Sequence, residues 1–350
     1  MGKEEIVAIS RIDRRGALLG AGAALFAPVV FSERAWAQTK LTKIRIVSSQ
    51  GNQVAALQEL TKQKRWLEEF GIDAEVLTVA DGAKLIGALI GGDSDVCIFS
   101  GFNQTLAAIE KGAKMKIIGG ASITGQQAVF SAKPEIKSVR DLQGKIIGVG
   151  ALGAQLHQVM RALLLKKGVD LNTVRFVNVG SSADVFRAIV AKTVDAGPAQ
   201  ADIFDQLEKY NIHMLDEGAF ANDLSEYTWQ ASFATDKVIA EKRDTLVRVL
   251  AGYCKAYRYV QTDPASKEPF IEARAKALGV ADMEVARREG ASQWQYVWDN
   301  KPYALDLEIS PARVEYMQKL NVDVGAQNKV LPYDQVADMS LARQAVKMLG

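Results

Sequence analysis

The chain is poor in the residue types that most often carry out chemistry. Its 350 residues include two cysteines and two histidines. His157 lies in a segment with helical spacing and His213 in an apolar, strand-like run, where a lone histidine is more often structural than catalytic. No His, Cys and carboxylate cluster has metal-ligand spacing, and no Gly-x-Ser-x-Gly or P-loop motif occurs. We therefore expect a protein that is not an enzyme and has no resident cofactor.

The two cysteines give no disulfide pattern. Cys97 falls in an apolar strand-like run and Cys254 in a helical one, so both resemble small buried hydrophobes. A disulfide between them is possible in an oxidising compartment, but nothing in the sequence favours it.

The chain also lacks a charge excess. After removal of the five basic and four acidic residues of the first 37, 38 basic and 37 acidic side chains leave a net charge near +1. Binding to nucleic acid or to an anionic membrane surface normally requires a basic footprint. Neither partner is expected.

One long apolar run occurs, near the N-terminus. Arg14 and Arg15 precede the apolar residues 16–31, and Ala35-Trp36-Ala37 follows as a small-x-small cleavage site. A membrane anchor is the alternative, but Pro28 interrupts the run, which is shorter than the roughly 20 residues of a span. The paired arginines favour a twin-arginine signal peptide over residues 1–37, cleaved after Ala37, and hence a periplasmic protein.

Two stretches about a hundred residues apart repeat the same order of elements. Strand-like residues 43–47 and 145–149 are each followed by a helix, a strand and a second helix. The second helix runs into Asp95-Val96 in the first stretch and into Asp195-Ala196 in the second, and a short apolar strand is expected over residues 95–99. Such units build parallel α/β layers. Two of them predict two lobes, with a cleft between them in which a small ligand can bind.

The remaining segments complete the predicted architecture. Residues 128–131 and 227–233 read as strands that cross between the lobes, and residues 199–210 read as a helix. From residue 236 onward the pattern is almost wholly helical, and these helices have no sheet of their own. We expect them to pack on the first lobe.

A glycine motif suggests a second reading. Gly148, Gly150 and Gly153 form a G-x-G-x-x-G run after a strand, as in dinucleotide-binding units, which makes an exported NAD(P)-dependent oxidoreductase the alternative function. The acidic residue that such units carry about 20 positions on is missing, because the next strand ends Val177-Asn178-Val179. Without dinucleotide binding, the motif still predicts a glycine-lined helix start whose N–H groups suit an anionic or polar ligand group.

The loops that follow the predicted strands carry hydroxyls, amides and glycines, and almost no charge. Ligands gather at the carboxyl ends of parallel strands, which selects residues 48–51, 100–103, 150–155, 181–182 and 197–200. Ordinary turn chemistry is the alternative explanation for each loop. Trp229, at the return crossing, either stacks on a flat ligand or belongs to the core.

Several segments together resemble a known family. Residues 86–96 (IGALIGGDSDV), residues 141–149 (DLQGKIIGV) and Val194-Asp195-Ala196-Gly197 are similar to solute-binding proteins of ABC importers, in the branch that binds nitrate, sulfonates, taurine and thiamine precursors. The similarity covers most of residues 40–260. Related enzymes of thiamine-pyrimidine synthesis carry a cysteine-rich stretch and histidines that this chain lacks.

The resemblance implies a type II periplasmic binding protein fold, α/β in class, with two lobes joined by two crossover strands and extra C-terminal helices. Lobe 1 would comprise residues 38–127 and 229–350, and lobe 2 residues 128–228. The protein would act as a monomer that delivers a small solute to an ABC permease and its ATPase. The predicted ligand-binding residues are Ser49, Gln50, Ser100, Gly101, Phe102, Gln127, Gly153, Ala154, Gln155, Gly197, Pro198 and Trp229.

The chain departs from this family in two places. Sulfonate-type members carry Ser or Thr at the second helix start, where this chain reads Ala151-Leu152-Gly153-Ala154, and many members show Trp-Glu-Pro where it reads Gln200-Ala201-Asp202. The departures argue against a tight inorganic oxyanion site. We expect a small organic ligand with one polar or carboxylate end, held against Phe102 or Trp229.

Overall fold

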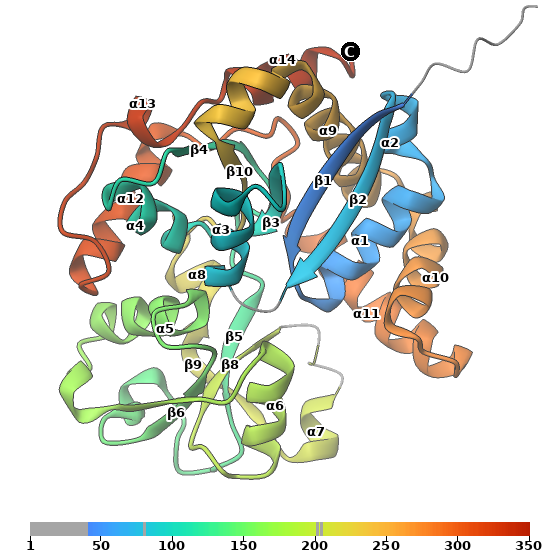
Figure 1. The fold of residues 1–350 in the computed structure, drawn as a ribbon. Coiled ribbons are helices and arrows are strands. Elements are labelled where there is room, and N and C mark those ends of the chain that lie inside the picture. Colours follow the sequence, from blue (N-terminus) through green and yellow to red (C-terminus); the bar gives the residue numbers. More distant parts are fainter. Residues whose placement is uncertain (1–40, 80–81, 201–202, 204–205) are drawn as a thin grey trace, which may run out of the picture. The chain divides into compact units, whose positions relative to one another are not determined.

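The computed structural model describes residues 41–350 except 80–81, 201–202 and 204–205 (Figure 1). The predicted signal peptide therefore lies outside the described residues. Within them, no helix has the length and apolar character needed to cross a bilayer.

The first lobe, as the name is used here, consists of the elements built on a five-stranded sheet of order β2-β1-β3-β10-β4. β1, β2 and β3 are parallel, and β10 runs antiparallel to both of its neighbours (Figure 1). The apolar residues of β1 and β3 are fully buried beneath helices, as expected for a parallel layer. Its elements are β1 (Thr42–Ser49), α1 (Asn52–Gln63), α2 (Trp66–Glu69), β2 (Ile72–Val79), α3 (Gly82–Gly91), β3 (Val96–Ser100), α4 (Asn103–Glu110), β4 (Met115–Gly120) and β10 (Ala231–Thr235).

The second lobe consists of the elements built on the strand pair β6-β7 and the three-stranded sheet β8-β5-β9. β6 and β7 are parallel, whereas β5 is antiparallel to both β8 and β9. Its elements are β5 (Gln127–Ser131), β6 (Ile146–Val149), α5 (Gln155–Lys166), β7 (Arg175–Asn178), α6 (Ser182–Val190), β8 (Gly197–Gln200), α7 (Leu207–Tyr210), β9 (His213–Ala219) and α8 (Phe220–Asp223).

The duplication seen in the sequence is present in the strand order. In the first lobe β2, β1 and β3 are followed by the antiparallel strand β10, and in the second β7, β6 and the segment from Ala196 through β8 are followed by the antiparallel strand β5. β10 lies late in the chain and β5 lies between the two repeats. Each lobe thus receives its antiparallel strand from a segment outside its own repeat.

In each repeat, one aspartate forms two hydrogen bonds with the backbone of the first strand. The Asp95 carboxylate accepts the Arg45 backbone N–H at 3.0 Å, and the Asp95 N–H donates to the Arg45 carbonyl at 2.8 Å. Asp195 makes the same two bonds with Ile146, at 2.6 and 2.8 Å. Burial would raise the pKa of each carboxyl, but the strand N–H and a lysine, Lys242 or Lys133, outweigh it and hold each pKa below its usual range.

We predict that Asp95→Asn and Asp195→Asn each lower the free energy of unfolding at pH 7 by about 1–3 kcal/mol, because a charged acceptor is lost. A lowered folded-state pKa stabilises the fold above the unfolded value of 3.8 and loses that contribution as pH falls through the folded pKa. Urea titrations below about pH 4 should therefore show a flatter acid dependence for either variant. Asp93→Asn, at an exposed carboxylate, is the control. An unchanged acid limb in the first two variants would refute the assignment.

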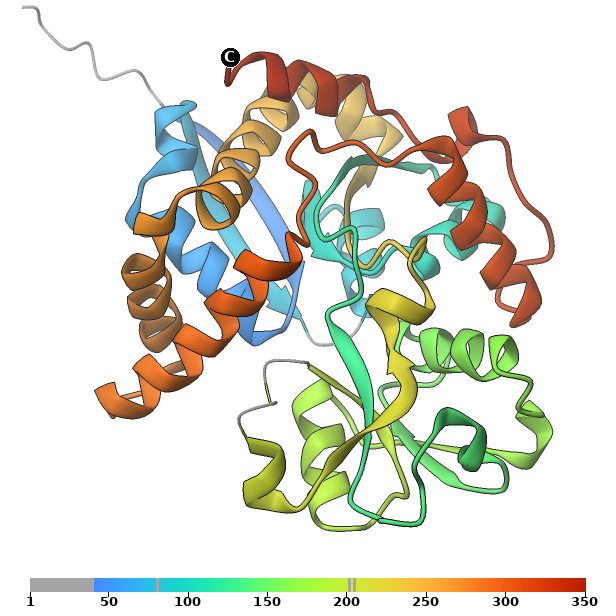
Figure 2. The ribbon, with the colours of Figure 1, turned by 180° about the vertical axis from the view of Figure 1, so that it is seen from behind.

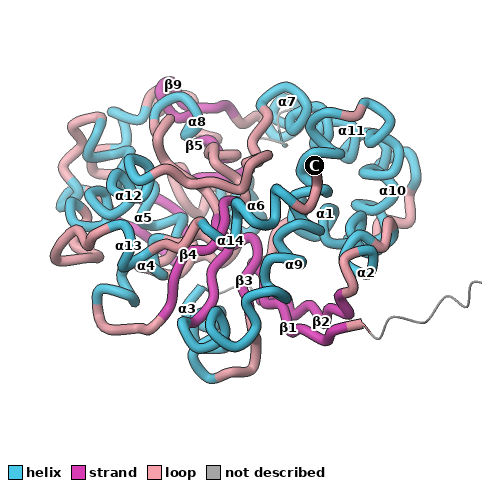
Figure 3. The backbone as a smooth tube through the Cα atoms, turned by 90° about the horizontal axis from the view of Figure 1, so that it is seen from above, coloured by secondary structure: helices cyan, strands magenta, loops and turns pink. Residues whose placement is uncertain are grey.

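The helices after β10 cover the first lobe. α9 runs in front of the strands β1 and β2 in Figure 2, and its kink at Lys242 coincides with the Lys242 Nζ–Asp95 Oδ1 ion pair of 2.9 Å. α10 packs on α1, and α12 touches both α4 and α5 (Figure 3), so one helix contacts both lobes. These helices are α9 (Asp236–Thr262), α10 (Lys267–Leu278), α11 (Met283–Asn300), α12 (Pro311–Asp323), α13 (Tyr333–Val336) and α14 (Ser340–Lys347).

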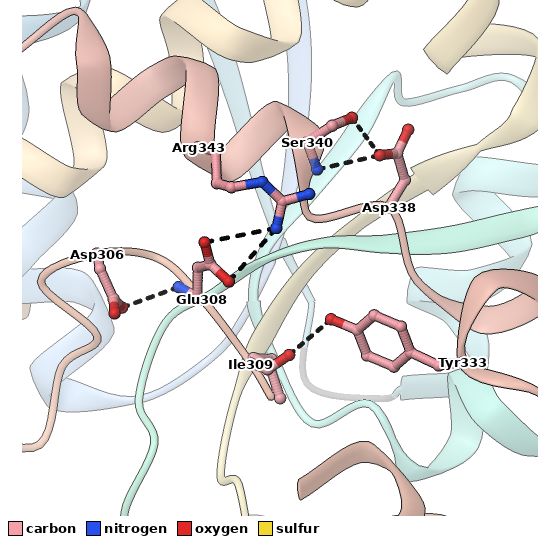
Figure 4. A network of polar contacts seen from close by, with 7 residues as sticks. All are labelled: Asp306, Glu308, Ile309, Tyr333, Asp338, Ser340 and Arg343. Atoms are coloured by element: carbon pink, nitrogen blue, oxygen red, sulfur yellow. Dashed lines mark hydrogen bonds and ion pairs between the residues drawn. The ribbon is translucent and has the colours of Figure 1, made fainter. Parts of the chain in front are cut away.

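The last segment of the chain is hydrogen-bonded to β4. The Asp338 N–H donates to the Ile117 carbonyl at 2.8 Å. In the network of Figure 4, the Tyr333 hydroxyl donates to the Ile309 carbonyl at 2.7 Å, and Arg343 reaches Glu308 at 3.5 Å. The C-terminal residues therefore extend the first lobe, as expected from their lack of a sheet.

Three sequence-based expectations on secondary structure are wrong. Residues 197–200 form strand β8 where a helix from residue 199 was expected, because this segment pairs with β5. The return strand begins at Ala231, four residues later than expected. The apolar spacing of residues 53–70 predicts a single helix, but the chain forms α1 and α2 with a break at Arg65, whose φ of 56° is left-handed. The two cysteines are free and buried, in agreement with their apolar surroundings.

A cavity at the strand ends

A cavity of about 440 Å³ lies at the carboxyl ends of the parallel strands. The starts of five helices border it: Gly51 and Asn52 before and in α1, Gly82 in α3, Gly101 before α4, Ala154 before α5 and Ser181 before α6. Helices from both lobes thus direct their positive ends at the same space.

Three of these helix starts lack a side-chain cap. In the described part of the chain, the N-cap residues of α1, α4 and α5 make no side-chain capping bond, whereas Ser181 and Asp184 form a capping box on α6. First-turn N–H groups have no partner within their own helix. The uncapped starts therefore present hydrogen-bond donors to the cavity.

The cavity wall is rich in amides, and its described residues carry no net formal charge. Nine of the 33 described residues that line it are glutamines: Gln50, Gln53, Gln104, Gln126, Gln127, Gln155, Gln200, Gln206 and Gln230. The only charged residues among those 33 are Arg274 and Glu289, which form an ion pair of 3.0 Å. Trp229, Tyr303 and Phe186 add aromatic surface. Burial raises the pKa of Tyr303 well above its usual range, so its hydroxyl stays protonated.

Eight of the twelve residues predicted from the sequence line this cavity. They come from both lobes and from the return crossing, and they are Ser49, Gln50, Ser100, Gly101, Gln127, Ala154, Gln155 and Trp229. Phe102, Gly153, Gly197 and Pro198 do not line it.

Gly153 stabilises the conformation of the loop in which it lies. Its φ of 84° requires glycine, and its N–H donates to His157 Nδ1 at 2.8 Å. Burial, with help from the charge of Arg161, lowers the pKa of His157 to about 4, so the ring is neutral and able to accept this bond. Gly153 therefore shapes the loop, whereas Gly150, Ala151 and Ala154 of the same loop line the cavity.

The other three residues belong to the core. Phe102 is fully buried. Gly197 and Pro198 are buried in β8, paired with Phe130 and Val129 of β5. Gly197 and Pro198 were expected in a loop, but they belong to strand β8, and the residues of this strand that line the cavity are Ala199 and Gln200.

Two glutamines reach across between the lobes. Gln155, the first residue of α5, donates from Nε2 to the Trp229 carbonyl at 2.6 Å and packs against Gly101. Gln104 of α4 donates to the Gly153 carbonyl at 3.3 Å. Side chains from either lobe thus close the cavity wall.

Sequence reasoning missed the contribution of the C-terminal half. Arg274, Glu289 and Tyr303 lie on segments that were expected only to support the first lobe. Their spacing in the sequence gives no signal of a site. The cluster of glutamines in strand-end loops was visible, but only the fold shows that they face one cavity.

Comparison with known proteins places the chain in a family. The model of the NMT1/THI5-like family matches residues 59–267, more than half of the chain, so the chain belongs to this family. A putative binding protein of Bacillus subtilis (strain 168), YtlA, is 22% identical over 312 residues, which cover 87% of this chain and 90% of that protein.

Solved structures share the fold. The alkanesulfonate-binding protein SsuA of Xanthomonas axonopodis pv. citri superposes with a TM-score of 0.65 at 20% identity, covering 85% of this chain and 97% of the other. The periplasmic nitrate-binding protein NrtA of Synechocystis PCC 6803 gives 0.68 at 14%, covering 89% of each chain. The fold is thus the expected type II periplasmic binding protein fold. These findings agree with the predicted solute-binding role and give no support to the oxidoreductase alternative.

Proposed function

We propose that this protein captures a small organic solute in the cavity at the strand ends and delivers it to an ABC permease and its ATPase. The observation that carries the proposal is the cavity itself, because uncapped helix starts and amide side chains from both lobes converge on it. Ligand sites are typically concave spaces of 300–1,000 Å³ with a few convergent polar groups. The predicted residues that line the cavity are proposed to contact the solute.

The lining defines the solute's chemistry. An amide both donates and accepts, so nine glutamines suit a ligand that carries both kinds of group. Because the described part of the wall holds no unpaired cation, a multiply charged anion would lack a counter-charge there, whereas helix starts suffice for one carbonyl or oxyanion. We infer an uncharged or singly negative organic solute whose flat or apolar part lies against Trp229.

The remaining expectations complete the proposal. The protein binds its solute without transforming it and acts as a monomer in the periplasm. The twin-arginine leader would export it, with cleavage after Ala37. Residues 38–127 with 229–350, and residues 128–228, would be the two domains that close on the solute by a hinge motion.

Native mass spectrometry of the protein purified without refolding from its own periplasm is the direct test. We expect an adduct of one small organic molecule per chain, lost on gentle unfolding. A carrier of this kind should also show no conversion of that molecule. Absence of an adduct, together with no stabilisation by any small organic solute in a thermal-shift library, would contradict the proposal.

We predict that Trp229→Ala weakens binding of the co-purified solute roughly tenfold, because an aromatic contact on the cavity wall is lost. Isothermal titration calorimetry gives the dissociation constant. Trp298→Phe is a matched control, since Trp298 stacks on Trp294 outside the cavity wall. Equal affinity of the Trp229 variant and the wild type would show that Trp229 belongs only to the core.

A further inference from the structure

The cavity extends to helices that sequence reasoning did not connect with binding. Arg274 of α10 and Glu289 of α11 line it, together with Tyr303 and with Gln53 from the first turn of α1. α10 packs on both α1 and α11, which brings these side chains to one end of the cavity.

Arg274 is held in place by two contacts at this end. Its Nη2 donates to Glu289 Oε2 at 3.0 Å and its Nε donates to Gln293 Oε1 at 3.2 Å. The residue is only 4% exposed. The guanidinium is therefore fixed in orientation and largely removed from solvent.

The third nitrogen of this guanidinium has no partner. Arg274 Nη1 is buried and has no acceptor among the described residues. Leaving a buried donor unsatisfied costs roughly 1–3 kcal/mol, and more when the group is charged, so such an atom requires an explanation. Arg274 is among the residues that line the cavity, so a ligand that reaches this nitrogen would supply the missing acceptor.

A second buried hydrogen-bond donor in the cavity wall also lacks an acceptor among the residues that the structure describes. Gln53 is 7% exposed, and its Nε2 has no partner in the described part of the chain. Gln53 belongs to the uncapped first turn of α1, whose backbone N–H groups are also donors. Its side chain lies beside the Tyr303 hydroxyl, but Nε2 does not meet hydrogen-bond geometry with it. Two buried donors in this part of the wall, Arg274 Nη1 and Gln53 Nε2, thus lack an acceptor within the described residues.

We propose that the Arg274 end of the cavity is a carboxylate subsite, in which Arg274 Nη1 and Gln53 Nε2 donate to one carboxylate of the solute. The inference rests on the proposed function and assigns one end of the cavity to the charged end of the ligand. The planar fork of arginine matches a carboxylate, and Glu289 balances its charge when no solute is bound. A buried charge without such a partner would be far costlier.

The probe for the test is acetate, the neutral control is acetamide, and the readout is the side-chain ¹⁵N–¹H resonance of Arg274, assigned by its absence in Arg274→Lys. In the full-length protein, acetate should shift this resonance saturably and acetamide should not. Arg274→Lys should weaken acetate binding roughly tenfold, measured by competition with the co-purified solute. Arg287→Lys, at an exposed position of α11, should change nothing.

Glu289→Gln separates recognition from a structural role. It removes the carboxylate that competes for Arg274, so acetate should bind several-fold tighter, although loss of the ion pair lowers stability. Weaker or equal acetate binding in this variant would overturn the subsite, as would the lack of a saturable acetate shift or an equal shift with acetamide. If the co-purified solute still binds in that case, only the subsite fails. If no solute binds the wild type, the proposed function fails as well.

Discussion

Replacing Gly197 with alanine should destabilise the protein by about 3 kcal/mol and lower its Tm by roughly 5–10 °C. A Cβ at this position would lie 2.5 Å from Val185 Cγ1 and 2.6 Å from the Gly148 carbonyl oxygen. The carbonyl is backbone of β6 and cannot turn aside as a side chain could. The added methyl group must therefore push β8 away from β6, in the middle of the second lobe.

Gly87→Ala is the matched control for this prediction. Gly87 lies within α3, and a Cβ there would have nothing within 4 Å. Because alanine favours a helix interior over glycine, this variant should gain about 0.5–1 kcal/mol. Differential scanning calorimetry of both variants gives the change in stability. A Gly197→Ala protein as stable as wild type would mean that β8 is not packed as described.

Replacing Gly101 with valine should weaken solute binding at least roughly a hundredfold. A Cβ on Gly101 would overlap the amide end of Gln155, and valine adds two more methyl groups to the cavity wall. Gln155 would lose its hydrogen bond to the Trp229 carbonyl, and the solute would lose part of its space. Titration calorimetry with the co-purified solute gives the affinity.

Gly87→Val carries the same substitution at an open helical position and should bind normally. The Gly101 variant should keep its far-ultraviolet circular dichroism, since Gly101 lies in the cavity wall between β3 and α4. Wild-type affinity in a folded Gly101→Val protein would place the solute outside this cavity.

The order of elements could be predicted because hydrophobic period and turn residues are local. The strands at 43–47 and 145–149 and the helices from residue 236 are confirmed within a few residues. β8 could not be recognised, because Gly197-Pro198-Ala199-Gln200 has no strand pattern and becomes a strand only by pairing with β5. The antiparallel partner, not the local sequence, decides its conformation.

The cavity was predictable to the extent that it follows from topology. The carboxyl ends of parallel strands gave Ser49, Ser100 and Gln155. Arg274 was not predictable in this way, because it reaches the cavity through the packing of α10 on α1. Gly153 lies outside the cavity lining, and its N–H, which the motif would offer to a ligand, donates to His157 instead.

Because β10, the antiparallel strand of the first lobe, lies late in the chain, the order of synthesis affects when this lobe can fold. β10 begins at Ala231, so a ribosome must translate nearly two-thirds of the chain before the sheet begun by β1 can be completed. A fragment that stops after β4 would expose the β3 edge, which β10 covers in the whole protein, and unpaired edges invite association between chains. Such non-local pairing also slows folding. The first-begun layer therefore stays incomplete until nearly two-thirds of the chain has been synthesised, and a folding helper would be needed most in that interval.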